Sequence, residues 1–412
     1  MPGKLKGVAT ASAEIPAFPI DRTPLCPFGP APGLLALQAD APLGKVRLWD
    51  GRIAWLVTRQ SEQRALLGDP RISRDSERPD YPHASAAGRE RGTVGRSFIG
   101  MDDPEHARLR RMVTGRFAIK RVEALRPAVQ RIVDDRIDRL LAGPKPVDLV
   151  QAFALPVPSL VICELLGVPY GDHDFFQASA ATLVSRRSSA EAARKANGEL
   201  LDYLGRLIDE KRADPGDDLL SELATRHVQT GELTQREAAG TGVLLLLAGH
   251  ATTANMIALG TLALLEHPVQ LAALRDADDP KLVAGAVEEL LRYLTIVHTG
   301  LRRVALADIV VGDQTIRAGD AVVLAVDAGN RDERAFAGPE RLDIHRDAAG
   351  HLAFGFGVHQ CLGQPLARVE LQVVYGTLYR RIPSLRLATD LEHVPFKDDG
   401  VIYGVNELPV TW

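Results

Sequence analysis

Cys361 closes a glycine-rich run and comes shortly before a stretch with a helical pattern. The run reads Phe-Gly-Phe-Gly-Val-His-Gln-Cys over residues 354–361, and the helical stretch follows at Gln364. A helix N-terminus offers unpaired N–H groups and the positive end of its dipole, which favour a thiolate over a thiol. Glycines let the backbone approach a flat, bulky group closely. A cysteine thiolate held in this way can be the axial ligand of a haem that activates dioxygen. The alternative is a buried cysteine in an ordinary turn, the usual environment of a free cysteine.

The run resembles the cysteine-ligand loop of the cytochrome P450 family at all fixed positions of that loop. These positions are Phe354, Gly355, Gly357, His359, Cys361 and Gly363. The resemblance implies that Cys361 binds the iron of haem b (iron protoporphyrin IX), with Phe354, Gly355 and Gly363 beside the cofactor. It also implies a mainly α fold with a minor β part, the triangular fold of that family. We expect residues 15–412 to form one catalytic domain after a flexible segment, 1–14.

The stretch Leu247–Met256 reads Leu-Ala-Gly-His-Ala-Thr-Thr-Ala-Asn-Met, which resembles the family's oxygen-activating helix. Ala248 and Gly249 would give the backbone room beside the cofactor, because glycine weakens a helix locally. The resemblance implies that Thr252 hydrogen-bonds water and the oxygen being activated. Alternatively, its hydroxyl bonds back to a carbonyl one turn earlier, as mid-helix threonines often do.

One position departs from the family pattern. An Asp or Glu usually precedes this threonine and is thought to relay protons, whereas this chain has Ala251. Proton transfer by a positioned group contributes roughly 10²–10⁴-fold to a rate, so water with Thr252, Thr253 or His250 would have to serve. Three explanations stay open: a natural variant with another relay, a substitution in an otherwise ordinary enzyme, or a reaction that needs no such relay. The family's nitric-oxide-reducing branch also carries Ala here.

Four residues fall where the family binds the haem propionates. His106 and Arg110 are four apart and therefore share one helix face. Arg303 begins an expected strand, and His359 lies in the cysteine loop. Each alone could be a solvated charge, but their order along the chain agrees with the resemblance.

Glu289 and Arg292 are three apart on one predicted helix face. Such a pair is common on protein surfaces, where it contributes little stability. Together with Arg341, however, it resembles the family's Glu-Arg-Arg network behind the haem, which forked arginine contacts can lock. We therefore expect a structural role for all three residues.

By the same resemblance, four segments line a substrate pocket above the haem. They are the loop 79–100, the helix face that carries Val243, the stretch 294–300 and the tail turn near Tyr403. The residues expected to bind substrate are Val243, Leu244, Leu247, Leu294, Ile296, Val297, His298, Ile402 and Tyr403. Most are aliphatic, which implies a bulky apolar substrate such as a macrolide, polyketide, sterol-like compound or drug. Arg89, Arg91 and Arg96 could meet a carboxylate or hydroxyl together with His298, or could face water.

Length and composition describe an ordinary globular protein. The chain has 412 residues, 46% hydrophobic and 25% charged, with net charge −4, which gives no support for nucleic-acid binding. Cys26, Cys163 and Cys361 are far apart, so neither a disulfide framework nor a zinc pattern is expected. The first 21 residues lack the roughly 20-residue apolar span of a membrane helix and the order of a signal peptide. We expect a cytoplasmic monomer that does not bind membranes.

Local patterns predict the main elements. A hairpin is expected around Asp50-Gly51, from 45–48 and 53–57. Helices are expected at 122–141, 190–213, 219–226, 282–293 and 361–381, with a helix carrying Ala248-Gly249 that Pro268 ends. Short strands are expected within 304–323, and a strand pair within 401–410 around Gly404.

The leading hypothesis is a monooxygenase of bacterial secondary metabolism. The chain has no flavin or iron–sulfur signature, so electrons should come from a ferredoxin and its ferredoxin reductase. Arg108, Arg111 and Arg368 could attract that acidic partner. The alternatives are an NADH-dependent nitric-oxide-reducing haem-thiolate enzyme and a non-catalytic haem protein.

Overall fold

The computed structural model describes residues 15–20, 22, 27–86, 88–89, 97–184, 188–397 and 401–412. The α-helices are α1 (Pro32–Asp40), α2 (Gln60–Leu67), α4 (Glu105–Thr114), α5 (Ile119–Ala124), α6 (Arg126–Ala142), α7 (Pro156–Leu166), α8 (His173–Val184), α9 (Ala190–Ala213), α10 (Leu219–Glu222), α11 (Gln235–Leu265), α12 (Pro268–Arg275), α13 (Pro280–Leu294), α14 (Val326–Gly329) and α15 (Gln364–Arg381). The strands are β1 (Leu43–Arg47), β2 (Ile53–Val57), β3 (Ile72–Ser73), β4 (Val147–Asp148), β5 (Leu301–Ala305), β6 (Ile309–Val311), β7 (Gln314–Ile316), β8 (Ala321–Leu324), β9 (Arg386–Leu387), β10 (Phe396–Lys397), β11 (Gly404–Val405) and β12 (Pro409–Thr411). The predicted fold class, mainly α with a minor β part, is confirmed.

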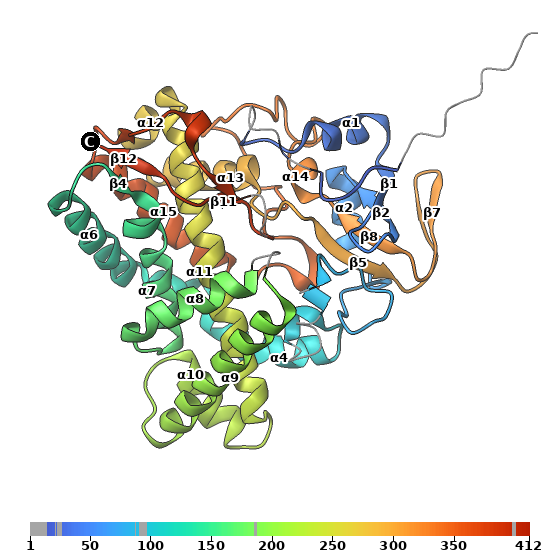
Figure 1. The fold of residues 1–412 in the computed structure, drawn as a ribbon, viewed down its shortest axis with the longest axis horizontal. Helices are drawn as coiled ribbons and strands as arrows, with labels where there is room; N and C mark the ends of the chain where they lie inside the picture. The colour runs from blue at the N-terminus through green and yellow to red at the C-terminus, as the bar shows by residue number, and fades with distance from the viewer. Residues whose placement is uncertain are drawn as a thin grey trace, which may run out of the picture.

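Helix α11 runs through the middle of the helical body (Figure 1). Its N-terminus is fixed by a capping box in which the Glu237 N–H donates to Thr234 Oγ1 and the Thr234 N–H donates to Glu237 Oε2. Although α11 is long and apolar enough to cross a membrane, 67% of its apolar window is buried inside the protein. It is therefore the core helix against which α7, α9 and α15 pack.

The largest sheet lies to one side of the helical body (Figure 1) and has the strand order β1-β2-β8-β5-β3. The predicted hairpin is confirmed, because β1 and β2 pair in antiparallel register with Lys45 opposite Trp55. Strand β8 pairs parallel with β2 and antiparallel with β5. Strand β3 pairs with β5 so that Ser73 lies opposite Val304. This last pairing brings residues near 74 beside residues near 303.

Proline positions explain where two predicted helices begin. The expected helix 122–141 is divided into α5 and α6, and Pro127 stands in the first turn of α6. The last helix begins at Gln364 rather than at residue 361, with Pro365 in its first turn. Proline is tolerated in a first turn because the N–H group it lacks would have no helical partner there.

The predicted strand pair within 401–410 is wrong. Strand β11 pairs with β10, whereas β12 pairs with β4 and β9. Gly404 is not a turn residue: it is buried against α11, where a Cβ would collide with the Asn255 amide. A pattern of apolar residues around a glycine therefore marks close packing here and not a hairpin. In contrast, α9 has the predicted bounds, and Ser189 caps it by accepting the Ala192 N–H.

Candidate active site

The cysteine loop is folded tightly before α15. Gly355 and Gly357 have φ values of +68° and +75°, a region that favours glycine. A Cβ on Gly357 would also collide with the backbone carbonyl of Leu67 at the end of α2. The Cys361 N–H donates to the Phe354 carbonyl over 2.8 Å. These constraints hold Cys361 immediately before Gly363, the residue that precedes α15.

The surroundings of Cys361 act on its thiol in two directions. The Cys361 side chain is exposed, but protein atoms surround it on most sides. This burial raises the pKa of the Cys361 thiol. The Gly363 N–H and the Arg110 guanidinium act in the opposite direction and lower it. The N–H groups at the start of α15 do favour the thiolate, as expected, but burial outweighs them and the pKa is raised overall. A coordinated metal ion deprotonates a thiol outright, so iron bound at Cys361 would convert this thiol to a thiolate.

The four expected propionate partners lie close to one another. His106 is buried on α4, and its ring centroid lies 4.2 Å from that of His359. Arg110 donates from Nη2 to the Gln360 carbonyl over 2.6 Å, which ties α4 to the cysteine loop. Arg303 on β5 is buried. Burial together with the positive charge of Arg303 lowers the pKa of His359 to about 3.

Arg74, which sequence reasoning missed, adds a further positive charge to this group. It follows β3, and burial together with Arg74 lowers the pKa of Arg303 to about 10. Within the group, His106 Nε2 is buried without a hydrogen-bond partner among the described residues. Unpaired buried donors and clustered like charges are costly. The two carboxylates of a haem satisfy this requirement, so the residues present fit that cofactor.

The residues of the expected oxygen-activating segment lie on two different faces of α11, one exposed and one packed against α7. Thr252 Oγ1 donates to the Ala248 carbonyl over 2.6 Å, which is the back-bonded alternative noted above. Gly249 lies against α7, where a Cβ would come within 2.9 Å of Ile162 Cδ1. Gly249 therefore allows close helix packing, while Ala248 is the exposed member of the pair.

His250 and Thr253 are buried, whereas Ala251 is half-buried. Burial and the charge of Lys397 lower the pKa of His250 to about 4, so its imidazole is neutral near pH 7. Lys397 Nζ donates to Asn255 Oδ1 over 3.1 Å, and Asn255 Nδ2 donates to the Ala251 carbonyl over 2.7 Å. The Ala251 carbonyl thus accepts a hydrogen bond from the Asn255 amide, which in turn accepts one from Lys397.

The buried network contains Arg346 and not the side chain of Arg341, which corrects the sequence prediction. Glu289 and Arg292 are fully buried and form a two-pronged pair at 2.7 and 2.8 Å. Arg346 Nε reaches Glu289 Oε1 at 3.1 Å. Arg341 instead points outward toward Glu340 at 3.7 Å, with 77% of its side chain exposed, and gives only its carbonyl to Arg292. The turn at Gly338, where φ is +56°, precedes both arginines.

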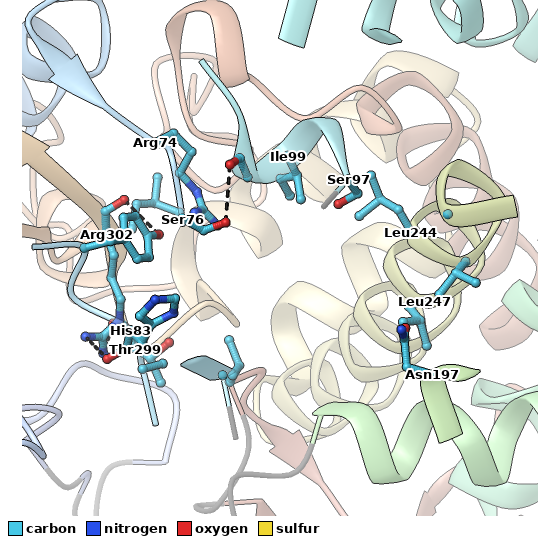
Figure 2. A pocket seen from close by; sticks show the side chains of 18 of the residues that line it. Arg74, Ser76, His83, Ser97, Ile99, Asn197, Leu244, Leu247, Thr299 and Arg302 are labelled. Atoms are coloured by element: carbon cyan, nitrogen blue, oxygen red, sulfur yellow. Dashed lines mark hydrogen bonds between the residues drawn. The ribbon is translucent and has the colours of Figure 1, made fainter. Parts of the chain in front are cut away.

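A cavity of about 570 Å³ lies between α11 and the residues near β3 and β5 (Figure 2). Of the predicted substrate residues, those that line it are Val243, Leu244, Leu247 and Val297. The others, which lie outside this lining, are Leu294, Ile296, His298, Ile402 and Tyr403. Tyr403 is buried and stacks on Phe396, with ring centroids 5.8 Å apart. From the C-terminal segment, Val401 lines the cavity instead of Ile402 and Tyr403.

The lining also contains polar residues that were not predicted individually. They include Arg74, Ser76, Tyr81, His83, Thr299 and Arg302. Tyr81 and His83 belong to the segment 79–100 and Thr299 to the segment 294–300, both expected to line the pocket, whereas Arg74, Ser76 and Arg302 lie outside the expected segments. Arg89 pairs with Asp50 at 2.9 Å, while Arg91 and Arg96 lie outside the described residues.

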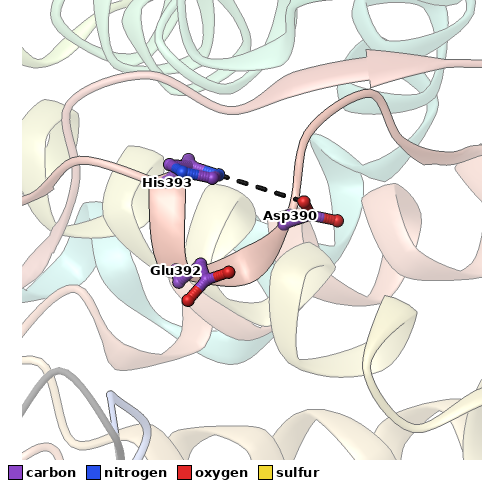
Figure 3. A group of neighbouring side chains, drawn as sticks. All are labelled: Asp390, Glu392 and His393. Carbon is purple, nitrogen blue, oxygen red and sulfur yellow. Dashed lines mark ion pairs between the residues drawn. The ribbon is translucent and has the colours of Figure 1, made fainter.

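One surface group offers metal-ligand atoms among the described residues (Figure 3). Asp390, Glu392 and His393 are all exposed, and their ligand atoms lie within 4.8 Å of one another. Exposed acidic groups of this kind are common without an ion. Cys361 therefore stays the predicted metal ligand.

Glu288 links α13 to α15 and to the segment after the buried network. It pairs with Arg368 at 2.6 Å and lies 3.1 Å from His351. Although burial opposes this, His351 and Arg368 lower the pKa of Glu288 to about 2. A depressed carboxyl pKa stabilises the fold above the ordinary value near 4.5, and this stabilisation is lost as pH falls toward 2.

We therefore expect Glu288→Gln to lower the free energy of unfolding at pH 7 by about 2–3 kcal/mol. The difference from the unsubstituted protein should shrink as pH falls from 5 to 3. Urea unfolding across this range measures it, with the exposed Glu392→Gln as the matched control. A Glu288→Gln deficit that stays constant with pH would contradict the assignment.

Known proteins with similar sequences support a haem-binding site in this chain. A family model described as Cytochrome P450 matches residues 172–382. Cytochrome P450 GfsF of Streptomyces halstedii is 55% identical over 97% of this chain and 97% of its own length. Mycinamicin VIII C21 methyl hydroxylase of Micromonospora griseorubida is 44% identical over 96% of this chain and 99% of its own length.

Solved structures show the same relationship. The crystal structure of GfsF covers 96% of this chain and 100% of that chain, with a TM-score of 0.91. The hydroxylase bound to mycinamicin VIII, 42% identical, covers 97% and 100% with a TM-score of 0.91. With its cysteine loop and a group of cations that fits the haem carboxylates, the chain belongs to the cytochrome P450 family, as a haem-binding monooxygenase.

Proposed function

We propose that this monooxygenase hydroxylates or epoxidises a bulky, largely apolar small molecule of secondary metabolism. The observation that supports this most directly is the cavity of about 570 Å³ beside α11, a volume typical of small-molecule sites. Its α11 wall carries the aliphatic side chains of Val243, Leu244 and Leu247.

The names of relatives support this substrate class. Pentalenic acid synthase of Streptomyces avermitilis is 49% identical, and vitamin D3 dihydroxylase of Streptomyces griseolus is 46% identical. Together with the mycinamicin VIII C21 methyl hydroxylase, these names refer to small organic molecules. We infer a substrate of comparable size and polarity for this chain.

The haem, when bound, supplies dioxygen activation, which a cysteine thiolate ligand favours. We propose that Cys361 holds its iron and that His106, Arg110, Arg303 and His359 bind its propionates. Thr252, whose hydroxyl hydrogen is given to the Ala248 carbonyl, keeps its lone pairs free to accept a hydrogen bond from water. Ala251 has no proton to give, so water beside Thr252 carries the protons that an acid would otherwise supply.

We propose that electrons come from a ferredoxin and its reductase. Arg108 and Arg368 are less available to an acidic partner than the sequence suggests, because they pair with Glu237 at 3.0 Å and with Glu288. Arg111 on α4 is exposed and is the best placed of the three. We also propose, as expected from the sequence, a cytoplasmic monomer without nucleic-acid or membrane partners.

Cys361→Ser tests the proposed iron ligand. We expect the variant to lose the ferrous–CO absorption band typical of a thiolate-bound haem and to lose product formation. Cys163→Ala is the matched control, because Cys163 is the other described free cysteine, is buried, and has a pKa raised to about 11 by its burial. The assignment fails if the Cys361→Ser protein keeps the thiolate-type band.

The second candidate, reduction of nitric oxide with NADH, is favoured by one sequence feature and one structural feature. Ala251 matches that branch of the family, and Arg74, Arg302 and Arg303 give the cavity a cationic wall that suits a phosphate-bearing donor. Anaerobic consumption of nitric oxide driven by NADH without a ferredoxin would establish it. The absence of such turnover would eliminate it.

A further inference from the structure

The cavity has two chemically different walls. Val243, Leu244 and Leu247 present aliphatic side chains from α11. Across the cavity, Arg74, Ser76 and His83 lie together (Figure 2). A cavity divided in this way favours a ligand with an apolar body and a polar group at one end.

Arg74 has no matching carboxylate at its side chain among the described residues. Its Nη1 atom is buried and has no hydrogen-bond partner among the described residues. The neighbouring carboxylate Asp102 accepts the backbone N–H of Arg74 over 2.7 Å and the hydroxyl of Ser73 over 2.5 Å. The guanidinium itself lies over the Tyr81 ring, 5.0 Å from its centroid. A buried guanidinium atom without a partner is costly, and a carboxylate is the group that best satisfies it.

Two carboxylate sources could meet Arg74, a haem propionate and a substrate. The haem propionates already have His106, Arg110, Arg303 and His359 available, and His106, Arg110 and His359 lie outside the cavity lining. Arg74 is within that lining, and the β3–β5 pairing sets it beside Arg303, at the border between the two sites. Arg74 is therefore a further cation beside the four expected propionate partners, and it lies in the cavity wall.

We propose that Arg74 binds a carboxylate of the substrate, so that the natural substrate is an apolar acid. This inference rests on the proposed monooxygenase function and specifies its substrate class. The aliphatic body of the acid lies against Leu244 and Leu247, and its carboxylate pairs with the Arg74 guanidinium. The Ser76 hydroxyl, which reaches the Gly100 carbonyl at 3.3 Å, can turn to the same carboxylate.

His83 supports a site for one anionic group. Burial and the charges of Arg89 and Arg74 lower the pKa of His83 to about 4, so its ring is neutral near pH 7. A neutral imidazole can donate one hydrogen bond without adding another positive charge. Glu237 also lines the cavity, but it is held by Arg108 at 3.0 Å and by the Thr234 N–H at 2.8 Å, so it does not compete for Arg74.

The test is an optical titration of the haem-loaded ferric protein with acids and their methyl esters. Suitable pairs are dodecanoic acid with methyl dodecanoate and a tricyclic diterpene acid with its methyl ester. We expect at least one acid to shift the haem band with a Kd about tenfold or more below that of its ester. Arg74→Gln should remove this preference, raising the Kd of the acid about tenfold with little change for the ester. Arg74→Lys should retain part of the preference for the acid, because lysine keeps the positive charge but lacks the paired N–H donors of the guanidinium.

Arg78→Gln is the matched control, since Arg78 pairs with Asp80 at 3.1 Å and lies outside the cavity lining. The inference is overturned if no acid is preferred over its ester, or if Arg74→Gln leaves the preference unchanged. It is also overturned if Arg74→Gln weakens haem retention with an unchanged preference, because Arg74 would then serve a propionate. A protein without a thiolate-type ferrous–CO band would instead refute the proposed function itself.

Discussion

Ala251→Glu should raise the fraction of consumed electrons that appears in product, with product formation about 100-fold faster, the lower end of what a positioned proton donor contributes. Position 251 precedes Thr252 on α11 and is half-buried, so a carboxyl there can exchange protons between solvent and the water beside Thr252. Ala251 offers no titratable group, and the neighbouring His250 is buried and has a pKa of about 4. The measurement is product formed per NADPH oxidised, with hydrogen peroxide as the uncoupled product and a surrogate ferredoxin system as electron source.

Ala251→Gln is the matched control, because it has nearly the same size and hydrogen bonds but cannot carry a proton. If product per NADPH oxidised rises in Ala251→Glu but not in Ala251→Gln, proton supply is the limiting step. Equal effects of Glu and Gln would mean that packing at position 251, and not a proton, had changed. No increase in either variant would show that the relay argument is wrong and that another path already suffices.

Arg292→Leu should destabilise the protein by about 3–5 kcal/mol, because it leaves the fully buried Glu289 without its two-pronged partner. Arg346→Ala should cost about 1–3 kcal/mol, since Arg346 also donates to the Gly338 carbonyl over 3.0 Å. Arg341→Ala should change stability by no more than about 0.5 kcal/mol, because its side chain is exposed. Urea unfolding of the three variants, together with their haem content, measures these differences.

The comparison between Arg346 and Arg341 remains decisive even if Arg292→Leu does not fold. Both arginines lie in the same segment, five positions apart, and both substitutions remove the same groups. A loss of stability in Arg341→Ala equal to that in Arg346→Ala would contradict the observed network.

The parts of the site that depend on local sequence could be predicted, whereas those that depend on long-range packing could not. The glycines around Cys361 and the spacing of His106 and Arg110 are local signals, and the structure brings these residues together. Arg341 and Arg346 lie outside regular secondary structure, so no periodicity says which one turns inward. Arg74 is distant in sequence from Arg303, and only the β3–β5 pairing reveals their proximity.

The pKa of the Cys361 thiol likewise could be predicted only in part from the sequence. A helix N-terminus can be read from the sequence, and it does act to lower the pKa of that thiol. Desolvation by the surrounding chain acts more strongly, and its extent depends on elements far away in the sequence. Similarly, Gly404 and Gly249 were interpreted from their flexibility, whereas the structure uses their lack of a side chain for close packing.

The parallel pairing of β2 with β8 has a consequence for biosynthesis. Ala54 pairs with Ala321 and Val57 with Leu324, so the five-stranded sheet cannot close until residues near 324 have left the ribosome. Ribosomes add about 5–20 residues per second. The edge of β2 that later pairs with β8 therefore stays unpaired for tens of seconds. Because Cys361 is made later still, the nascent chain cannot acquire its haem until nearly all of it has been synthesised.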